Sequence, residues 1–507
     1  MEASQSHLYP NIDISVWTRS CVQEIKTPIE GKVTGIIPLW LRGSLLRNGP
    51  GSTSVGPTKF NHLFDCSALL HRFAIQDGRV TYQCQFLRSN TWKKNRVANR
   101  IVVNEFATSA VPDPCHTIFD RMSSFFNIGE TMTDNAVVSV YPFGDQVYAL
   151  SEVPFMLRID SETLETLERK SLIDSVVVNH TSHPHVMRNG DVYNVGVSTR
   201  KGRIRHVVVK FPFVEKGDMF EGAQIVGSMA PRWSLNPAYM HSFGITENYF
   251  VIVEQPLSIS LGKFVCNQFT NNPIVSCLNW NPEYDTHITL INRKTGKEEK
   301  RYITETLFFV HIINCFEEEG YLNVDLCAYK DAKIIDGMYL EALENMQSNP
   351  NYADWFRSRA KRIQLPLLSP NLTRVAARQI SDVGCEMPRI NYSLCNGKAY
   401  RYFYAISSDV DSERPGSLIK VDTWNGQVTS WAEDHSFCSE PVFVPAPDAE
   451  DEDAGVLLSA ILWNHEDTRV TLIVLDGQTM VELARVDFHT PSPVPKDLHG
   501  WFISENV

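Results

Sequence analysis

The chain has 507 residues, of which 43% are hydrophobic and 21% charged, a composition typical of a globular protein with a sizeable core. Its formal net charge of −12, without any block rich in Lys or Arg, argues against nucleic acid as the main partner, because phosphate binding needs a concentrated basic surface. No run of 18 apolar residues occurs, so we expect no membrane-spanning helix.

The N-terminal stretch MEASQSHLYPNIDISVW lacks a basic region followed by an apolar one, so we do not expect a secretory signal. The 11 cysteines are scattered along the chain, and none forms a CxxC pair. We therefore predict reduced thiols and a cytoplasmic protein.

Tight-turn dipeptides recur along most of the chain, and several separate strand-like apolar runs. They are Asp77-Gly78, Asn189-Gly190, Thr295-Gly296, Asn396-Gly397, Asn425-Gly426 and Asp476-Gly477. Asn-Gly and Asp-Gly supply the positive φ angles of type I′ hairpin turns. With no long βαβ alternation and no GxGxxG motif, the pattern predicts an all-β fold.

Helical periodicity is confined to two segments, 114–129 and 337–362. In the second, Leu340, Leu343 and Met346 share one face, and Pro350 interrupts the pattern. We expect both segments to be insertions that cover one face of the β-fold. The acidic segment 446–455 is interpreted as a solvated surface loop.

Four histidines lie in short apolar or Pro/Gly-punctuated segments: His183 in TSHPH, His241 in AYMHSFG, His311 in FFVHIINCF and His499 in DLHGWF. Each alone has a simpler interpretation. A lone buried histidine is more often a core residue than a ligand, and a histidine near a terminus is commonly at the surface. His185 would face the same side of a strand as His183, but Pro184 disturbs that strand, so we expect one ligand from this segment.

The spacing of these histidines and of three glutamates is nearly even. From His183 the steps run 58 to His241, 70 to His311, 75 to Glu386, 54 to Glu440 and 59 to His499, with Glu152 before them. A step of roughly 60 residues fits one long-looped blade of a β-propeller. If each residue lies on the innermost strand of its blade, all of them converge on one axis, and both chain ends close a single blade.

Four neutral imidazoles on an axis would form a metal site, and Fe, Zn and Cu all suit this ligand. A set without an anionic ligand favours iron and oxygen chemistry over hydrolysis. Glu152, Glu386 and Glu440 lie in apolar contexts, where a buried carboxylate needs a partner, either an imidazole N–H or a Lys or Arg side chain. They could also be general bases, but no GxSxG or HExxH motif accompanies them.

The motifs resemble the carotenoid cleavage oxygenase family over nearly the whole chain, and most of all its insect isomerooxygenase type. The motifs that carry this resemblance are IPLWLRGSLLRNGPG, HLFDCSALLHRF, VPDPCHTIF, TSHPH, YMHSFG, HIINCFE, MYLEALENMQSNPNYA, YRYFYAISSDVD, SEPVFV and LHGWF. Cys66 stands where most members have glycine, which marks a subtype.

The resemblance implies a seven-bladed propeller in which residues 1–507 form one domain, with a helical dome over the axial site. It implies Fe(II) bound by His183, His241, His311 and His499, with O2 as co-substrate. Glu152, Glu386 and Glu440 would each hydrogen-bond one of these histidines, and the fourth ligand would lack a carboxylate partner.

The activity implied is cleavage of a carotenoid at its central 15,15′ double bond with trans–cis isomerisation of one half. The products would be all-trans and 11-cis retinal-type aldehydes for visual chromophore synthesis. Candidate tunnel residues are Phe64, Phe106, Tyr239 and Tyr329, with plain core packing as the alternative. Alternative functions are a retinoid isomerohydrolase acting on retinyl esters and a non-catalytic carotenoid-binding protein.

Because a carotenoid is too apolar to arrive through water, we expect peripheral contact with a membrane. The segment 114–129 offers an amphipathic surface for it, or else packs on the dome. Its candidate contact residues are Cys115, Ile118, Phe119, Met122, Phe125 and Phe126.

Overall fold

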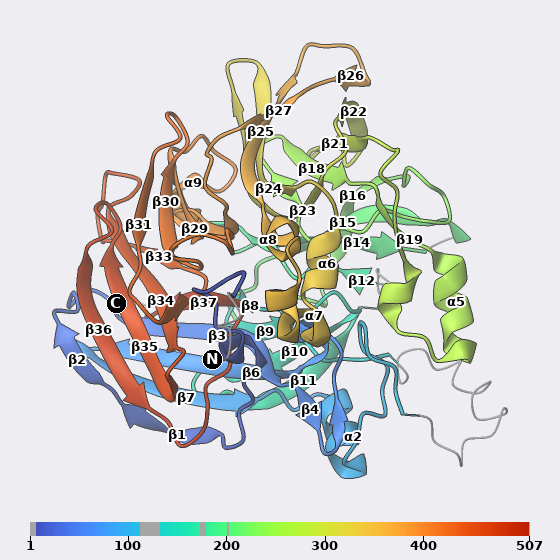
Figure 1. Ribbon diagram of the computed structural model, residues 1–507. Helices are drawn as coiled ribbons and strands as arrows, with labels where there is room; N and C mark the ends of the chain where they lie inside the picture. Colours follow the sequence, from blue (N-terminus) through green and yellow to red (C-terminus); the bar gives the residue numbers. More distant parts are fainter. Residues whose placement is uncertain (1–6, 112–131, 173–178, 200–201, 506–507) are drawn as a thin grey trace.

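A computed structural model describes residues 7–111, 132–172, 179–199 and 202–505. It confirms the predicted seven-bladed β-propeller: seven sheets of four to six strands surround a common centre (Figure 1). We number the blades in the chain order of their innermost strands, with the C-terminal strand in blade 1.

In every blade, one edge of the sheet faces the centre of the ring and the other faces outwards. From the centre outwards, blade 1 contains β37 (His499–Ser504), β3 (Gly43–Ser52), β6 (Ser67–Gln76), β7 (Arg79–Phe86) and β1 (Ile25–Glu30). Blade 2 contains β8 (Ser139–Phe143), β9 (Gln146–Leu150), β10 (Phe155–Ile159) and β11 (Thr166–Ser171). Blade 3 contains β12 (Asn179–His180) and β13 (His185–Val186), both paired with β14 (Val192–Ser198), then β15 (Arg205–Phe211) and β16 (Gln224–Met229). Blade 4 contains β17 (Gly244–Ile245), β18 (Tyr249–Glu254), β21 (Thr286–Asn292), β22 (Glu298–Thr304) and β26 (Thr373–Arg374).

The remaining three blades complete the ring. Blade 5 contains β23 (Phe308–Glu318), β24 (Tyr321–Tyr329), β25 (Arg359–Pro366) and β27 (Ala377–Gln379). Blade 6 contains β28 (Glu386–Arg389), β29 (Tyr402–Ile406), β30 (Leu418–Asp422) and β31 (Val428–Trp431). Blade 7 contains β32 (Ser436–Cys438) and β33 (Val442–Pro445), both paired with β34 (Gly455–Trp463), then β35 (Glu466–Asp476), β36 (Glu482–His489) and β2 (Lys32–Gly35). Among the described residues, two short pairs lie outside the blades, β4 (Ser54–Val55) with β5 (Thr58–Lys59) and β19 (Leu257–Ile259) with β20 (Leu278–Trp280).

Both ends of the chain close the ring, as the sequence predicted. The C-terminal strand β37 pairs antiparallel with β3, with His499 opposite Asn48, and the N-terminal strand β2 pairs with β36 of blade 7. Strand pairing across the chain ends leaves no open gap between the first and last blades. This closure places His499 on an innermost strand.

The core of the protein lies between the blades. A buried apolar cluster fills each interface between neighbouring sheets; for example, Leu45 and Leu472 belong to the cluster between blades 1 and 7. Burial of these faces stabilises the ring by roughly 25 cal/mol per Å² of apolar surface removed from water. The centre of the ring is thereby held by packing on all sides.

Helices lie at the ends and faces of the blades. In the part of the chain that the structure describes, they are α1 (Ser15–Thr18), α2 (Asn90–Ala98), α5 (Leu261–Thr270), α6 (Lys333–Gly337), α7 (Leu340–Glu344), α8 (Tyr352–Phe356) and α9 (Tyr392–Cys395), with 3-10 turns η1 (Leu63–Asp65), η3 (Ile274–Cys277) and η4 (Met346–Ser348). In Figure 1, α6, α7 and α8 lie over the middle of the ring, as expected for a dome. The predicted segment 337–362 differs in its bounds, because it is broken into short helices and its last four residues belong to β25. The other predicted helical segment, 114–129, lies outside the described residues.

The turn predictions hold only in part. Asp77 and Gly78 both have positive φ and join β6 to β7, as a type I′ turn requires. Asn396-Gly397 instead follows helix α9 and is not a hairpin turn. After Asp476 the turn is longer, and Met480 rather than Gly477 takes the positive φ, so the type I′ prediction is wrong there.

Candidate metal centre

The innermost strands bring four imidazole rings together at the centre of the propeller. His183, His241, His311 and His499 each offer a ring nitrogen, and these four atoms lie within 4.8 Å of one another. The ring centroids of contacting pairs are 4.5 to 5.0 Å apart. The Nε2 atoms of His183 and His241 are 2.9 Å apart. The four residues predicted from spacing therefore form one cluster.

A bulge in β23 directs His311 to the centre. Residues on a regular strand alternate between its two faces, so Val310 and His311 would point in opposite directions. The β23–β24 register shifts on both sides of Ile312, and Val310 and His311 line the same cavity. Bulges re-aim side chains in this way.

The other histidines use breaks or ends of innermost strands. His183 lies in the gap between β12 and β13, where Pro184 cannot donate a ladder hydrogen bond. His241 lies shortly before β17, and His499 is the first residue of β37. His185 turns away from the cluster, because its Nδ1 bonds Tyr392 at 2.8 Å and its Nε2 bonds the Phe243 carbonyl at 2.9 Å.

Three of the four imidazoles are backed by the predicted glutamates. His311 Nδ1 donates to Glu386 Oε2 at 2.6 Å, and His499 Nδ1 donates to Glu440 Oε1 at 2.8 Å. His241 Nδ1 contacts Glu152 Oε1. A hydrogen bond at Nδ1 fixes the tautomer and leaves the Nε2 lone pair facing the centre.

The fourth imidazole has a hydroxyl in place of a carboxylate. His183 Nδ1 lies 3.4 Å from the Tyr141 hydroxyl, which comes from β8 of blade 2. Tyr141 thus completes a ring in which the innermost region of every blade contributes a residue to the centre. The sequence analysis missed Tyr141, because a tyrosine on a buried strand carries no distinguishing pattern.

Glu440 lies in a network of charges that the sequence analysis also missed. Arg389 donates from Nε and Nη2 to its two carboxylate oxygens at 2.9 and 3.1 Å. Arg47, which is fully buried, donates to the Glu440 carbonyl at 2.9 Å and bonds Asp497 through Nε and Nη2 at 3.0 and 2.7 Å. The motifs LLRNGPG and EMPR contain both arginines, but spacing alone does not indicate their partners.

This network decides the ionisation of Glu440. Burial by itself would raise the pKa of the carboxyl group, but Arg389, His499 and Arg47 outweigh it and hold that pKa far below its usual value. Glu386 behaves similarly: burial raises its pKa, and His311 with the Met387 backbone N–H lowers it overall. Both carboxylates are therefore ionised acceptors for their imidazoles.

Two of the four imidazoles, those of His183 and His499, lie in surroundings that favour the neutral form. Burial away from water lowers the pKa of His183 well below its usual value, and the neighbouring histidines lower it further. Burial also lowers the pKa of His499 to about 4, although Glu440 acts in the opposite direction. Metal coordination needs neutral imidazole, so this environment favours it.

The donor set fits a transition-metal ion such as iron. His311 Nε2 is buried and has no hydrogen-bond partner among the described residues, while its Nδ1 is already satisfied. Four convergent imidazole nitrogens, three of them backed by carboxylates, are a donor set that borderline metal ions favour.

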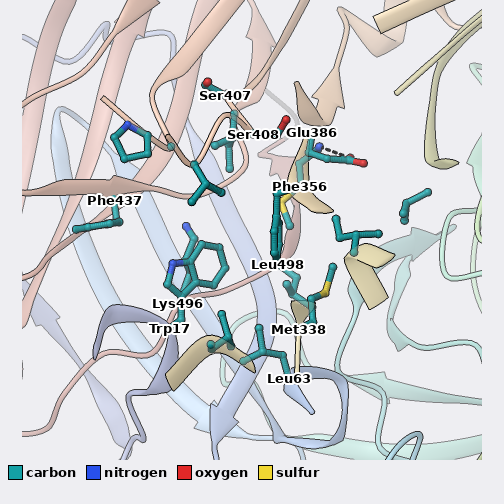
Figure 2. A pocket seen from close by; sticks show the side chains of 18 of the residues that line it. Trp17, Leu63, Met338, Phe356, Glu386, Ser407, Ser408, Phe437, Lys496 and Leu498 are labelled. Carbon is teal, nitrogen blue, oxygen red and sulfur yellow. Dashed lines mark hydrogen bonds between the residues drawn. The ribbon is translucent and has the colours of Figure 1, made fainter. Parts of the chain in front are cut away.

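An apolar cavity opens from this centre, with about 1320 Å³ of space between its atoms including the part open to solvent. His241, His311 and His499 line it together with Glu386, whose position Figure 2 shows. Most of the remaining wall is aliphatic or aromatic. Residues of the dome that line it are Ile334, Met338, Leu343, Met346, Tyr352 and Phe356. Five of these six residues belong to the segment 337–362, which therefore lines one side of the cavity.

The structure separates the four candidate tunnel residues into two pairs. Phe64 and Tyr329 belong to the cavity wall. Phe106 instead packs on Phe64, with ring centroids 6.0 Å apart, and the Tyr239 hydroxyl lies 3.3 Å from His241 Nδ1. Cys66 is fully buried. The candidate membrane residues Cys115, Ile118, Phe119, Met122, Phe125 and Phe126 lie outside the described residues.

The chain combines a seven-bladed propeller with a central cluster of four histidines, which places it in a class of propellers suited to a metal ion on their axis. The family described as "Retinal pigment epithelial membrane protein" (RPE65) matches residues 18–504. The chain is 61% identical to a carotenoid isomerooxygenase of Galleria mellonella, over 99% of both chains. It is 46% identical to the carotenoid isomerooxygenase of Drosophila melanogaster, over 98% of this chain and 94% of the relative.

Matches at lower identity come from the same family of proteins or share its fold. A β,β-carotene 15,15′-dioxygenase of Gallus gallus is 38% identical over 96% of this chain and 97% of the relative. A solved variant of Synechocystis apocarotenoid oxygenase superposes with a TM-score of 0.80 at 21% identity, over 98% of this chain and all of the other, and shares the fold. The chain belongs to the RPE65/carotenoid oxygenase family. Among its described helices, none has the length and hydropathy needed to span a bilayer.

Proposed function

We propose that this protein is an Fe(II)-dependent dioxygenase that cleaves a carotenoid at its central 15,15′ double bond and isomerises one half. The products would be an all-trans and an 11-cis retinal-type aldehyde, as needed for visual chromophore synthesis. The observation that carries the proposal is the four-histidine cluster, three of whose members line an apolar cavity. The names of the relatives at 61% and 46% identity support it.

The four histidines would hold Fe(II), which when bound supplies a site for O2 beside the substrate. The reaction consumes one C=C bond and one O2 and yields two carbonyl groups, so no other reductant is needed. Three imidazole rings would be kept in the ligating tautomer and orientation by the carboxylates of Glu152, Glu386 and Glu440. The Tyr141 hydroxyl would do the same for His183.

The cavity wall would bind the polyene and exclude water. Phe64 and Tyr329 offer aromatic faces to an extended conjugated chain, and the dome residues close the cavity from above. Burial and the charge of Glu386 raise the pKa of Tyr329 well above its usual value, so its hydroxyl stays protonated. The wall therefore adds aromatic and aliphatic surface without a further ionised group at this position.

We further propose peripheral membrane association, because an apolar substrate partitions into bilayers. The backbone preceding the predicted contact segment is fixed against α5 and η3: Asn271 Nδ2 donates to the Ala110 carbonyl at 2.9 Å, and Val275 N donates to the Phe106 carbonyl at 2.7 Å. Exposed Val265 on α5 and nearby Leu235 would extend the apolar surface there.

Chromatography of retinoids tests the proposed reaction. Iron-loaded protein receives an all-trans carotenoid in detergent under air, and a matched sample is kept under argon. We expect equal amounts of all-trans and 11-cis retinal, formed only with oxygen. Formation of all-trans retinal alone would show that the enzyme cleaves without isomerising. Longer aldehydes would show that it cleaves a double bond other than the central one. If the carotenoid stays unchanged and added retinyl esters are hydrolysed, the protein is an isomerohydrolase rather than an oxygenase. Pigment that binds but is not consumed would indicate a carotenoid carrier.

A further inference from the structure

A buried lysine lines the same cavity as the histidine cluster. Lys496 has an exposed fraction of 6% and lies in the extended segment that leads into β37, three residues before His499. Figure 2 shows it beside Trp17, across the cavity from Glu386. A span of three residues covers at most about 10 Å of extended chain, so the backbone of Lys496 lies within about 10 Å of that of His499, and both residues line the same cavity.

The amine of Lys496 has no carboxylate partner within 4.0 Å among the described residues. Its Nζ donates to the Cys438 carbonyl and lies 5.0 Å from the centroid of the Trp17 ring. The neighbouring Asp497 is engaged by Arg47 through both carboxylate oxygens. A buried lysine is ordinarily paired with a carboxylate, so this environment is unusual.

The other charged residues of the cavity wall do have partners. Glu386 accepts from His311, and Asp409 accepts from Arg359 Nη1 at 2.8 Å. Lys420, a lysine of blade 6 with the same exposed fraction, is ion-paired with Asp453. Lys496 thus differs both from its neighbours in the wall and from a lysine buried elsewhere in the fold.

These surroundings make the amine nucleophilic. Burial lowers the pKa of Lys496 to about 8, with Asp497 acting in the opposite direction and Arg47 in the same direction. Desolvation in an apolar pocket beside another cation is how lysines are activated for reaction with carbonyl compounds. A useful fraction of the amine is therefore neutral near physiological pH.

We propose that Lys496 captures an aldehyde in this cavity as a reversible imine, the aldehyde being one half of the cleaved carotenoid. The inference rests on the proposed function, which supplies the aldehyde. The Nζ lone pair of the neutral amine attacks the carbonyl carbon and a C–N bond forms. The carbonyl oxygen then leaves as water with the two protons of that amine, and a C=N bond remains. No oxidant or reductant is consumed, and addition of one water releases the aldehyde again.

The cavity supports this capture. Trp17, Phe437 and Leu498 line the cavity with Lys496 and add apolar surface that suits a polyene, and the wall is continuous with the histidines where the aldehyde would form. A product half would move along the cavity from the histidines to reach the amine. The imine would retain it there until hydrolysis, so the second product could leave first.

Trapping with borohydride tests this inference. The full-length iron-loaded protein is kept under argon and mixed with one equivalent of all-trans or 11-cis retinal, reduced with borohydride, and measured by intact mass and peptide mapping. We expect one retinyl group per chain, located on Lys496. Two matched variants, Lys496→Arg and Lys420→Arg, each keep the positive charge and remove one buried primary amine. We expect Lys496→Arg to lose the adduct and Lys420→Arg to keep it.

Absence of an adduct on Lys496 in the wild-type protein would overturn the inference, as would equal labelling of folded Lys496→Arg. If that variant does not fold, peptide mapping of the wild-type protein decides alone. The assay supplies the aldehyde directly, so it does not depend on carotenoid cleavage. Cleavage without an adduct would reject the role of Lys496 alone, whereas an adduct without cleavage would reject the oxygenase and leave an aldehyde-binding lysine.

Discussion

Two His–Glu pairs of the four-histidine cluster have the same chemistry but opposite surroundings. At His499, Glu440 has an exposed side-chain fraction of 2% and is bonded by Arg389, with Arg47 beside it. At His241, Glu152 has an exposed fraction of 23% and no arginine partner among the described residues. The first pair lies in a charge-balanced part of the core, and the second is a partly exposed contact without an arginine. We therefore expect loss of the carboxylate to destabilise the core more at Glu440 than at Glu152.

The largest expected effect is loss of a histidine from the cluster. We predict that His499→Ala or His241→Ala abolishes iron binding and carotenoid turnover while the β-rich circular dichroism spectrum is kept. His185→Gln is the matched control, since His185 lies near the cluster but bonds Tyr392 and the Phe243 carbonyl. Full iron occupancy in His499→Ala, measured by elemental analysis, would remove His499 from the site.

The next prediction compares the two His–Glu pairs directly by removing the charge of each glutamate. Glu440→Gln leaves the buried charges of Arg47, Arg389 and Asp497 unbalanced, and we predict a loss of about 3–5 kcal/mol in the free energy of unfolding. Glu152→Gln should change that free energy little and lower iron affinity about 10- to 100-fold. Denaturant unfolding and iron titration of both variants check this.

Restoring the charge balance sharpens the result. The double variant Glu440→Gln with Arg389→Gln removes one anion and one cation, so we expect it to recover part of the stability lost in Glu440→Gln. Equal losses of unfolding free energy in Glu440→Gln and Glu152→Gln would contradict the proposed difference in stability between the two His–Glu pairs.

A pH effect is expected on the His499 side of the centre. The pKa of Lys496 is lowered to about 8 in the folded protein, from an ordinary value of 10.5. Between these values the unfolded chain holds a proton that the folded chain has lost, so folding stability from this group rises with pH. We predict that Lys496→Met flattens the stability profile between about pH 8 and 10.5, by at most about 3 kcal/mol. Identical profiles for the two proteins in thermal unfolding would contradict this.

The smallest effect concerns the imidazole that lacks a carboxylate. Tyr141→Phe removes the hydroxyl 3.4 Å from His183 Nδ1 and leaves the ring packed on Trp501. A neutral, long hydrogen bond contributes about 1 kcal/mol, so we predict a loss in iron affinity of less than about 10-fold. Iron titration measures it, and a loss as large as that of Glu152→Gln would show that Tyr141 has an equivalent role.

The sequence predicted the fold and the members of the cluster, because a repeat near 60 residues reflects one blade and one axis. It could not predict how the side chains reach that axis. The bulge at His311 depends on pairing with β24, and the positive φ of Met387 beside Glu386 depends on its place in β28. Such features are set by tertiary contacts rather than local pattern.

The charge partners could not be predicted from the sequence either. Arg47 and Asp497 are 450 residues apart along the chain, and only the closure of blade 1 by β37 brings them together. Lys496 also gave no signal, because a lysine between a proline and an aspartate is typical of an exposed loop. Its burial follows from the cavity that several blades and the dome build jointly.

Anomalous diffraction at the iron edge from crystals of the iron-loaded protein tests the central claim most directly. The account predicts one strong peak per chain, in contact with Nε2 of His183, His241, His311 and His499 and open towards the cavity. A peak elsewhere, or bound iron that contacts fewer than four of these histidines, would contradict it.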